Sequence, residues 1–174
     1  LLSSQLEAGL SMDAIRANIK LAISGGQNEP RDAIAGTIGT LLENHSQLES
    51  IISGSKTWLQ AFEEYSRWMS PIGMSPRRIA KNFIYKNVEF YENDMIFFMF
   101  GSANRDEAIF QNPDYFDISR DNGSSISFGA GPHFCAGAWI SKTLIAEVAL
   151  PLFFSHFSNL YIKKPIEFQG WAFR

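Results

Sequence analysis

The sequence predicts a mainly α-helical fold with a small β component, an α+β chain. Three observations lead to this fold class: a long helical pattern near the N-terminus, two runs rich in β-branched and aromatic residues in the middle, and an apolar run of helical length near the C-terminus. The chain has 174 residues, of which 45% are hydrophobic. This is enough to build the core of one domain.

The first predicted helix spans residues 12–42. Ser11 is its expected N-cap, and Asp13 places a negative charge in the first turn, where the helix dipole favours it. Gly25-Gly26 and Pro30 are expected to interrupt this helix. The reason is that a proline inside a helix removes one backbone hydrogen bond and kinks the axis.

Two shorter helices are expected next, over residues 47–53 and 57–69. The second should end at Ser70-Pro71, because the residue before a proline is disfavoured in the helical conformation.

The middle of the chain predicts a β-hairpin followed by a loop. Residues 79–90 and 95–100 have strand composition and flank a turn signal at Asn93-Asp94. Residues 104–125 are polar and show no clear period, so they predict a long ordered loop. A final helix is expected over residues 138–154.

Composition excludes several function classes. The net charge of −3 gives no basic excess for nucleic acid. A single cysteine cannot form an internal disulfide and suits a reducing compartment. No uninterrupted apolar run is expected to be long enough to span a bilayer.

The only cysteine, Cys135, lies in the glycine-rich segment 127–137, directly before the last predicted helix. Glycines allow unusual backbone angles and close approach. Backbone N–H groups and the positive end of a helix would stabilise a thiolate over a thiol. A cysteine thiolate is one of the few axial ligands of haem iron. The alternative is a buried, inert cysteine.

Four residues of this segment give a family resemblance. Phe128, Gly131, Cys135 and Gly137 match every fixed position of the signature of the cytochrome P-450 family, the haem-thiolate monooxygenases. The resemblance implies haem b as cofactor, with Cys135 as the axial metal ligand and the other three residues in the cofactor-binding loop.

The resemblance covers nearly the whole chain and implies the C-terminal part of the family's fold. The expected parts are a long oxygen-side helix, a K-type helix, a β-hairpin, a meander loop, the Cys-ligand loop and the helix after it. Residues 1–174 would form the C-terminal fragment of a single haem-thiolate catalytic domain, with the N-terminal half absent. The first residue, Leu1, is not methionine, which agrees with a missing natural N-terminus.

Glu64 and Arg67 lie three residues apart on a predicted helix and so share one face. By composition alone this would be a solvated ion pair. The family has a Glu-x-x-Arg pair that joins its K helix to the loop before the cysteine, and Glu64 and Arg67 match it. An arginine that often joins this pair is replaced here by Tyr115, and Arg120 is the candidate substitute. All of these roles would be structural, as would that of the matching segment Asn104-Arg105-Asp106.

Two basic residues resemble haem propionate ligands of the family. Arg78 fits the arginine at the start of the strand after the K helix, with Arg77 as its rival. His133, two residues before the cysteine, fits a histidine that often binds the other propionate. A guanidinium matches a carboxylate with two parallel hydrogen bonds. The alternative for each is an exposed charge on a loop.

The oxygen-side helix departs from the family pattern. Gly25 and Gly26 keep the small residues of the oxygen groove, but Asn28 replaces the usual acid and Glu29 replaces the threonine that helps deliver protons. These four residues are the catalytic candidates, and a carboxylate at position 29 can relay protons. The alternatives are a surface pair between Glu29 and Arg31, or a site that uses peroxide.

Together these matches imply a haem-thiolate monooxygenase that inserts one oxygen atom of dioxygen into a small apolar organic substrate. Electrons would come from a ferredoxin-type or flavin reductase partner, and the low cysteine count suits a cytoplasmic protein of bacterial type. The alternatives are a peroxide-using haem enzyme, or a haem-free, non-catalytic fragment or pseudoenzyme. The isolated chain is expected to self-associate and to hold haem weakly or not at all.

Overall fold

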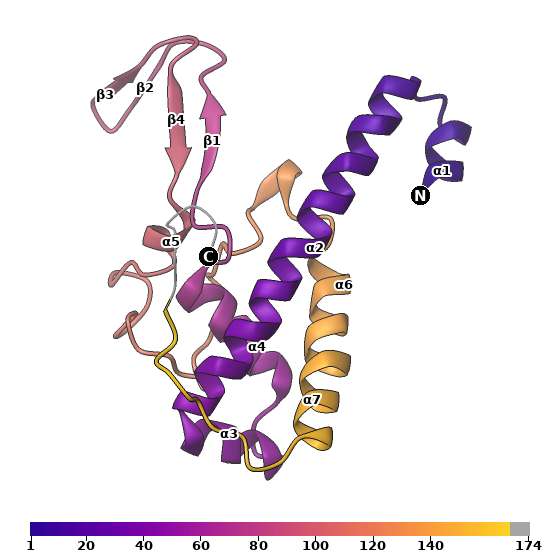
Figure 1. The fold of residues 1–174 in the computed structure, drawn as a ribbon. Helices are drawn as coiled ribbons and strands as arrows, with labels where there is room; N and C mark the ends of the chain where they lie inside the picture. Colours follow the sequence, from indigo (N-terminus) through magenta and orange to yellow (C-terminus); the bar gives the residue numbers. More distant parts are fainter. Residues whose placement is uncertain (168–174) are drawn as a thin grey trace.

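The structure is a computed structural model that describes residues 1–167. The last seven residues of the predicted domain, 168–174, lie outside the described residues. Figure 1 shows a helical body with a small β projection, which confirms the predicted α+β fold class. The α-helices are α1 (Leu2–Glu7), α2 (Met12–Glu43), α3 (His45–Ile52), α4 (Trp58–Met69), α5 (Phe100–Ala103), α6 (Ala138–Lys142) and α7 (Leu150–His156).

Helix α2 is more regular than the sequence predicts. Ser11 caps it, because its side chain accepts a hydrogen bond from the backbone N–H of Ala14 at 3.2 Å. The expected interruption at Gly25-Gly26 and Pro30 is wrong: 32 residues form one unbroken helix. The helix continues past Pro30 because a proline removes only a single hydrogen bond. Burial of the following turns in the core, from Ala33 onward, compensates for that loss.

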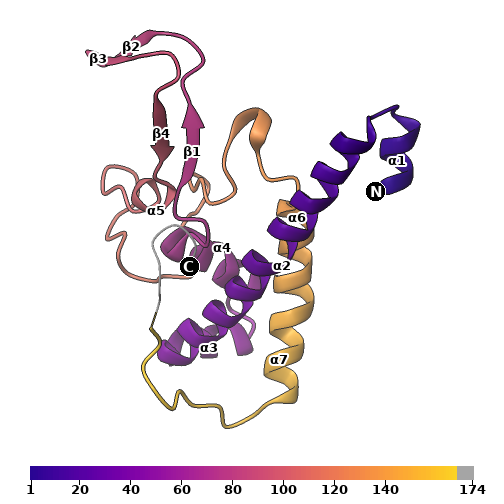
Figure 2. The ribbon, with the colours of Figure 1, turned by 45° about the horizontal axis from the view of Figure 1, so that its top comes forward.

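The core lies where the second half of α2 crosses α4 and the C-terminal helical segment 138–156. Its buried residues come from these elements, from α3 and from the long loop. Figures 1 and 2 show the first half of α2 and α1 projecting away from this body. Helix α4 begins with a capping box, in which Thr57 and Gln60 satisfy each other's backbone N–H groups.

Helices α2 and α4 approach each other closely at Gly36. A Cβ atom at this position would lie 1.8 Å from the hydroxyl oxygen of Tyr65, which is itself buried. Only the missing side chain allows the two helices to come this near. Gly36 is therefore a packing requirement, which the sequence alone did not reveal.

The final helix is one column built from α6, a π-helical stretch η2 (Thr143–Ala149) and α7. It confirms the helix expected over 138–154. The expectation that nothing is apolar enough to span a bilayer is corrected: residues Ala138–His156 have the length and composition required, with a mean hydropathy of 1.3. Core helices of soluble proteins meet the same criterion, and Ile145 and Leu150 here pack in the core.

The β region differs from the single hairpin predicted. Strand β1 (Ser75–Arg78) pairs antiparallel with β4 (Met95–Phe98), and β2 (Phe83–Tyr85) pairs with β3 (Val88–Phe90). Lys86 and Asn87, at the β2–β3 turn, both have positive φ angles, as a two-residue type I′ turn requires. The chain therefore turns back inside the run expected to be one strand.

The predicted long loop is confirmed. Between Asn104 and Ala130 the structure contains turns and bends but no helix or strand. A short 3₁₀ turn, η1 (Gly131–His133), then leads to Cys135. The loop is held in two ways: Phe116 and Ile118 pack in the core, and polar groups of the loop contact side chains of α4.

Candidate functional site

A cavity of about 490 Å³ opens between α2, α4, the β1–β4 ladder and the segment around Cys135. Its walls are mostly aromatic and aliphatic, and they come from segments far apart in the sequence. The aromatic residues on its walls are Phe62, Phe98, Phe100 and Phe128. Such a concave apolar site with a few polar groups is the usual form of a cofactor pocket.

Cys135 lies on one wall of this cavity, at the end of a tightly turned segment. Gly129 and Gly131 have φ angles of +73° and +65°, in the left-handed region that favours glycine. The segment closes on itself through a hydrogen bond of 2.9 Å from the backbone N–H of Cys135 to the carbonyl oxygen of Phe128. The thiol is free and exposed, so the alternative of a buried, inert cysteine does not apply.

Of the other three signature residues, only Phe128 lines the cavity. Phe128 lines the cavity and packs against Phe62, with ring centroids 6.2 Å apart. Gly131 and Gly137 are not among the lining residues. Gly137 is the N-cap of α6, and a Cβ atom there would lie 3.8 Å from the sulfur of Cys135. These glycines therefore shape the backbone beside the thiol.

Helix α2 forms a second wall and contributes Gly25 and Glu29. The neighbouring candidates Gly26 and Asn28 do not line the cavity. The Oε2 atom of Glu29 is buried and has no hydrogen-bond partner within residues 1–167. Arg31, the expected surface partner of Glu29, instead donates to Asp32 at 2.8 Å, and this hydrogen bond raises the pKa of Arg31.

The structure distinguishes the two arginines of β1. Arg77 lines the cavity and lies over the ring of Phe98, whereas Arg78 does not line it and points to the carbonyl oxygen of Asn93. Successive side chains of a strand point to opposite faces, so only one of the two can face the cavity. His133, from η1, also lines it.

The residues around the cavity fit a haem group. The cavity offers one accessible thiol, broad apolar walls, and two basic side chains, Arg77 and His133, for two carboxylates. A haem needs an axial ligand, apolar contact for its ring, and partners for its propionates. Among residues 1–167, no group of three or more His, Cys, Asp and Glu side chains could hold a separate metal ion.

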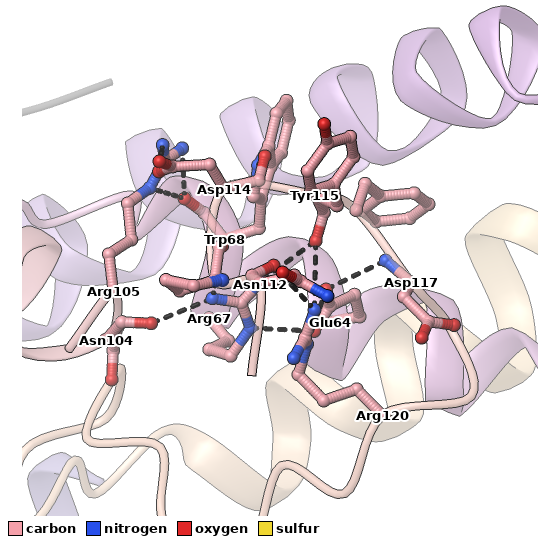
Figure 3. Close-up of polar contacts among 12 residues, drawn as sticks. Glu64, Arg67, Trp68, Asn104, Arg105, Asn112, Asp114, Tyr115, Asp117 and Arg120 are labelled. Atoms are coloured by element: carbon pink, nitrogen blue, oxygen red, sulfur yellow. Dashed lines mark hydrogen bonds and ion pairs between the residues drawn. The ribbon is translucent and has the colours of Figure 1, made fainter. Parts of the chain in front are cut away.

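A buried polar cluster made of Glu64, Arg67 and Arg120 joins α4 to the long loop (Figure 3). Glu64 and Arg67 are fully buried and paired by two hydrogen bonds of 2.8 Å each. The solvated-pair alternative is therefore wrong. Arg120 reaches the same carboxylate at 3.2 Å, so it does act as the third partner. Tyr115 contributes only its backbone carbonyl.

Asn104 extends this cluster to the segment before the cysteine. Its carbonyl accepts a hydrogen bond of 2.8 Å from Arg67, and its side chain bonds the backbone N–H of Ile126 at 2.9 Å and the hydroxyl of Ser127 at 3.1 Å. Arg105 holds the end of α4 through the carbonyl of Trp68. The structural role expected for this segment agrees with these contacts.

Sequence reasoning missed several cavity residues, because they come from positions that only the tertiary fold brings together. Arg77 was named only as a rival, and Gly129 lies inside the recognised segment without being singled out. The other missed lining residues have no sequence signal of their own; they include Ser66, Ile72, Phe98, Phe100, Ile126, Ser141 and Ile145.

The sequence is similar to known proteins over most of its length. Residues 59–168 match the family model of cytochrome P-450. The chain belongs to the cytochrome P-450 family. It is 34% identical over 163 residues to a cytochrome P-450 of Bacillus subtilis, and 32% identical over 143 residues to a steroid C26-monooxygenase of Mycolicibacterium smegmatis. These alignments cover 93% and 82% of this chain but 40% and 36% of those proteins.

The fold agrees with solved cytochrome P-450 structures. The structure of epothilone B-bound cytochrome P-450epoK matches with a TM-score of 0.84 at 28% identity, covering 94% of this chain and 40% of that one. The chain thus spans less than half the length of the cytochrome P-450 proteins it matches. Family membership implies a haem cofactor with a cysteine thiolate ligand, and the cavity residues fit that group.

Proposed function

We propose that this chain forms the haem-binding part of a haem-thiolate monooxygenase, with Cys135 as the axial ligand. The observation that carries the proposal is the shared cavity: Cys135 and Glu29 come from distant segments and line the same apolar space. Residues 1–174 would belong to one catalytic domain as its C-terminal part. The chain aligns with 40% of the cytochrome P-450 of Bacillus subtilis, and this supports its assignment to one part of such a domain.

When bound, haem supplies the redox chemistry by which one oxygen atom of dioxygen enters a substrate. The chain's own contribution begins with Cys135. The turn through Gly129 and Gly131 presents the thiol at the cavity. The aromatic walls exclude water and hold a flat apolar ring.

Two basic residues would hold the haem carboxylates. We assign one to Arg77, in place of Arg78, because Arg77 lines the cavity. Its Nη1 atom also donates to the hydroxyl of Ser75 at 2.7 Å, which orients the guanidinium. His133 is the partner proposed for the second carboxylate.

Helix α2 would provide the oxygen side. Glu29 is the residue proposed to accept and release protons, since it is a carboxylate on the cavity wall. Gly25 leaves open space at the same wall, because a Cβ atom there would meet nothing within 4 Å. Gly26 and Asn28 flank these two residues on the helix, so their proposed contribution is to local shape.

The substrate proposed is a small apolar organic molecule, and the electron donor is a ferredoxin-type or flavin reductase. The apolar lining supports this substrate class, and the relative that is named a steroid monooxygenase agrees with it. Cytoplasmic localisation is proposed from the likeness to bacterial relatives. We further propose that the isolated chain self-associates.

A peroxide-using haem enzyme is the second candidate, favoured because Glu29 replaces the threonine that helps deliver protons in the family. The two are separated by comparing product formation with hydrogen peroxide alone and with reductase, reduced nicotinamide cofactor and dioxygen. We expect faster turnover with the reductase system. Turnover with peroxide only would support the second candidate. Absence of haem from the purified protein would contradict both and favour a non-catalytic protein.

A further inference from the structure

We propose that the substrate of this site carries one cationic amine on an otherwise apolar body, and that Glu29 binds the amine. The proposal rests on the proposed function, because it concerns the substrate of the haem-binding cavity. It goes beyond that function by adding a positive charge to a small apolar molecule. A carboxylate has two oxygens, so binding an ammonium at one of them is compatible with proton transfer at the other.

The carboxylate of Glu29 has no partner in the described part of the chain. It lines the cavity, and its Oε2 atom is buried without a hydrogen-bond donor within residues 1–167. The nearby Arg31 pairs instead with Asp32 at 2.8 Å. A buried acceptor without a donor is unfavourable, and a buried charge without a counter-charge is more so. A ligand that brings a positive charge to this wall would remove that cost.

The neighbours of Glu29 on the cavity side of α2 offer no side-chain donor, but they leave space. Gly25 and Ala33 lie four residues before and after it, so the three residues share one face of the helix. All three line the cavity, as does Pro30, which has no backbone N–H. A Cβ atom at Gly25 would meet nothing within 4 Å. The helix thus presents one carboxylate between two small residues, with room for the head group of a ligand.

The positive groups of the cavity have other partners. Arg77 donates to the hydroxyl of Ser75 and to the carbonyl oxygen of Pro76, both at 2.7 Å. Within residues 1–167, no ion pair joins Arg77 or His133 to Glu29. Both basic residues are proposed to hold haem carboxylates. Haem binding would therefore use the positive charges of the lining and leave Glu29 available for a cation of the substrate.

The rest of the lining favours an apolar body for the same substrate. Aromatic rings of Phe62, Phe98 and Phe100 contribute to the walls, and aromatic faces also attract cations. A carboxylate attracts a cation more strongly in apolar surroundings than in water, because less solvent screens the two charges. It repels an anion for the same reason. The lining therefore discriminates by charge at one point and by apolar contact elsewhere.

The test measures ligand binding to the haem-loaded protein with three probes that share a phenylbutyl chain. One probe ends in trimethylammonium, one in the isosteric but neutral tert-butyl group, and one in a carboxylate. A quaternary ammonium has no lone pair, so it cannot bind the haem iron directly. Isothermal titration calorimetry gives the Kd of each probe for the wild type, for Glu29→Gln and for Glu43→Gln. Glu43 is the matched control, because it is exposed near the far end of the same helix.

The decisive quantity is the Kd of the neutral probe divided by the Kd of the cationic probe. The contribution of the shared chain cancels when this ratio is compared between variants. We expect Glu29→Gln to lower the ratio about tenfold or more, because the attraction between two opposite charges is lost. Glu43→Gln should match the wild type. A role of Glu29 in proton transfer alone would leave the ratio unchanged, so binding separates the two roles.

An unchanged ratio in Glu29→Gln overturns the proposal, as does an equal decrease in Glu43→Gln. If Glu29→Gln does not hold haem, the wild type decides. Its cationic probe must bind more tightly than the carboxylate probe, and equal or reversed affinities overturn the proposal. The reduced carbon-monoxide complex of the wild type is measured separately. A red-shifted Soret band there leaves the proposed function standing whatever the probes show, whereas haem without that band contradicts the proposed function and this proposal together.

Discussion

Glu29 is the only acidic residue on the cavity wall within residues 1–167, and it carries a buried oxygen without a partner. A buried acceptor that lacks a donor is unfavourable, by about 1–3 kcal/mol for a neutral group and more for a charge. A buried polar atom without a partner therefore calls for an explanation, and a role in catalysis is one such explanation. Its position on α2, facing the wall that carries Cys135, is what the proton-transfer proposal requires.

Glu29→Gln removes the titrating group and keeps the size of the side chain. We expect slower dioxygen-dependent turnover, or a larger share of electrons released as hydrogen peroxide, with an unchanged Soret spectrum. Measuring product and peroxide per reduced nicotinamide consumed checks this. The control is Glu43→Gln, an exposed position near the far end of the same helix. Equal coupling in both variants would remove Glu29 from proton delivery.

Arg77→Ala and Arg78→Ala test which arginine holds a haem carboxylate. A charge-assisted hydrogen bond is worth about 1.5–3 kcal/mol, so its loss should speed haem dissociation about tenfold or more. We expect this for Arg77→Ala only, because Arg78 does not line the cavity. Transfer of haem to excess apomyoglobin measures the rate. Faster loss from the Arg78 variant alone would reverse the assignment.

These residues also show what a sequence can and cannot predict about a site. Cys135 and its glycines were predictable because the spacing of the motif is local. Arg77 and Arg78 are adjacent and chemically identical, and only the pairing of Arg77 with Ile96 across two strands fixes which one faces the cavity. That pairing is a long-range property, and a single residue shift would exchange the two.

At the scale of elements, the crossing of α2 and α4 controls the geometry of the cavity, since both helices contribute to its walls. Gly36 and Tyr65 meet at this crossing. Glu64 and Arg67 of the buried polar cluster also belong to α4. The packing at Gly36 and the polar bonds of Glu64 and Arg67 thus both hold α4 in its place beside the cavity.

Gly36→Ala should destabilise the fold. The added methyl group would lie 1.8 Å from the Tyr65 hydroxyl, and overpacking of a core costs about 1–3 kcal/mol. Urea unfolding followed by circular dichroism measures the change. Gly26→Ala is the matched control on the same helix, because its Cβ atom would meet nothing within 4 Å. We expect it to be neutral or to stabilise the protein by up to about 1 kcal/mol. Equal effects would show that the crossing is loose.

The sequence was sufficient to predict that most of the helices exist, but not the regular course of α2 or the pairing of the strands. The cap at Ser11 and the apolar patterns marked the helices, whereas the capping box at Thr57 is seen only in the structure. Pro30 misled, since tertiary packing of the following turns outweighs one missing hydrogen bond. The β-hairpin was wrong because the Lys86-Asn87 turn carries no glycine or proline signal.

At the scale of the whole molecule, the outer face of the last helical column is unusually apolar. Its large hydrophobic side chains are exposed, with Trp139 at 80% and Ile140 at 71%, and the row continues through Leu144, Val148 and Leu152. Monomeric proteins rarely expose apolar patches larger than about 300–600 Å². Each 100 Å² covered would contribute about 2.5 kcal/mol, so association is favoured.

The isolated chain should therefore self-associate at micromolar concentration. Light scattering gives the mass, and haem quantified on the same sample shows whether the cofactor is retained. We expect oligomers with less than one haem per chain. Leu152→Glu places a charge on the row and should shift the population toward smaller species, whereas Glu43→Gln should not. A monomer with stoichiometric haem would show that this chain is self-sufficient.

The proposed chemistry depends above all on Cys135 as the axial ligand of a haem iron. The most direct measurement is the absorption spectrum of the reduced carbon-monoxide complex of the haem-loaded protein, compared between the wild type and Cys135→Ser. We expect a red-shifted Soret band in the wild type and its loss in the variant, because only a thiolate donates enough electron density to produce that shift. Retention of the red-shifted band in Cys135→Ser would contradict it.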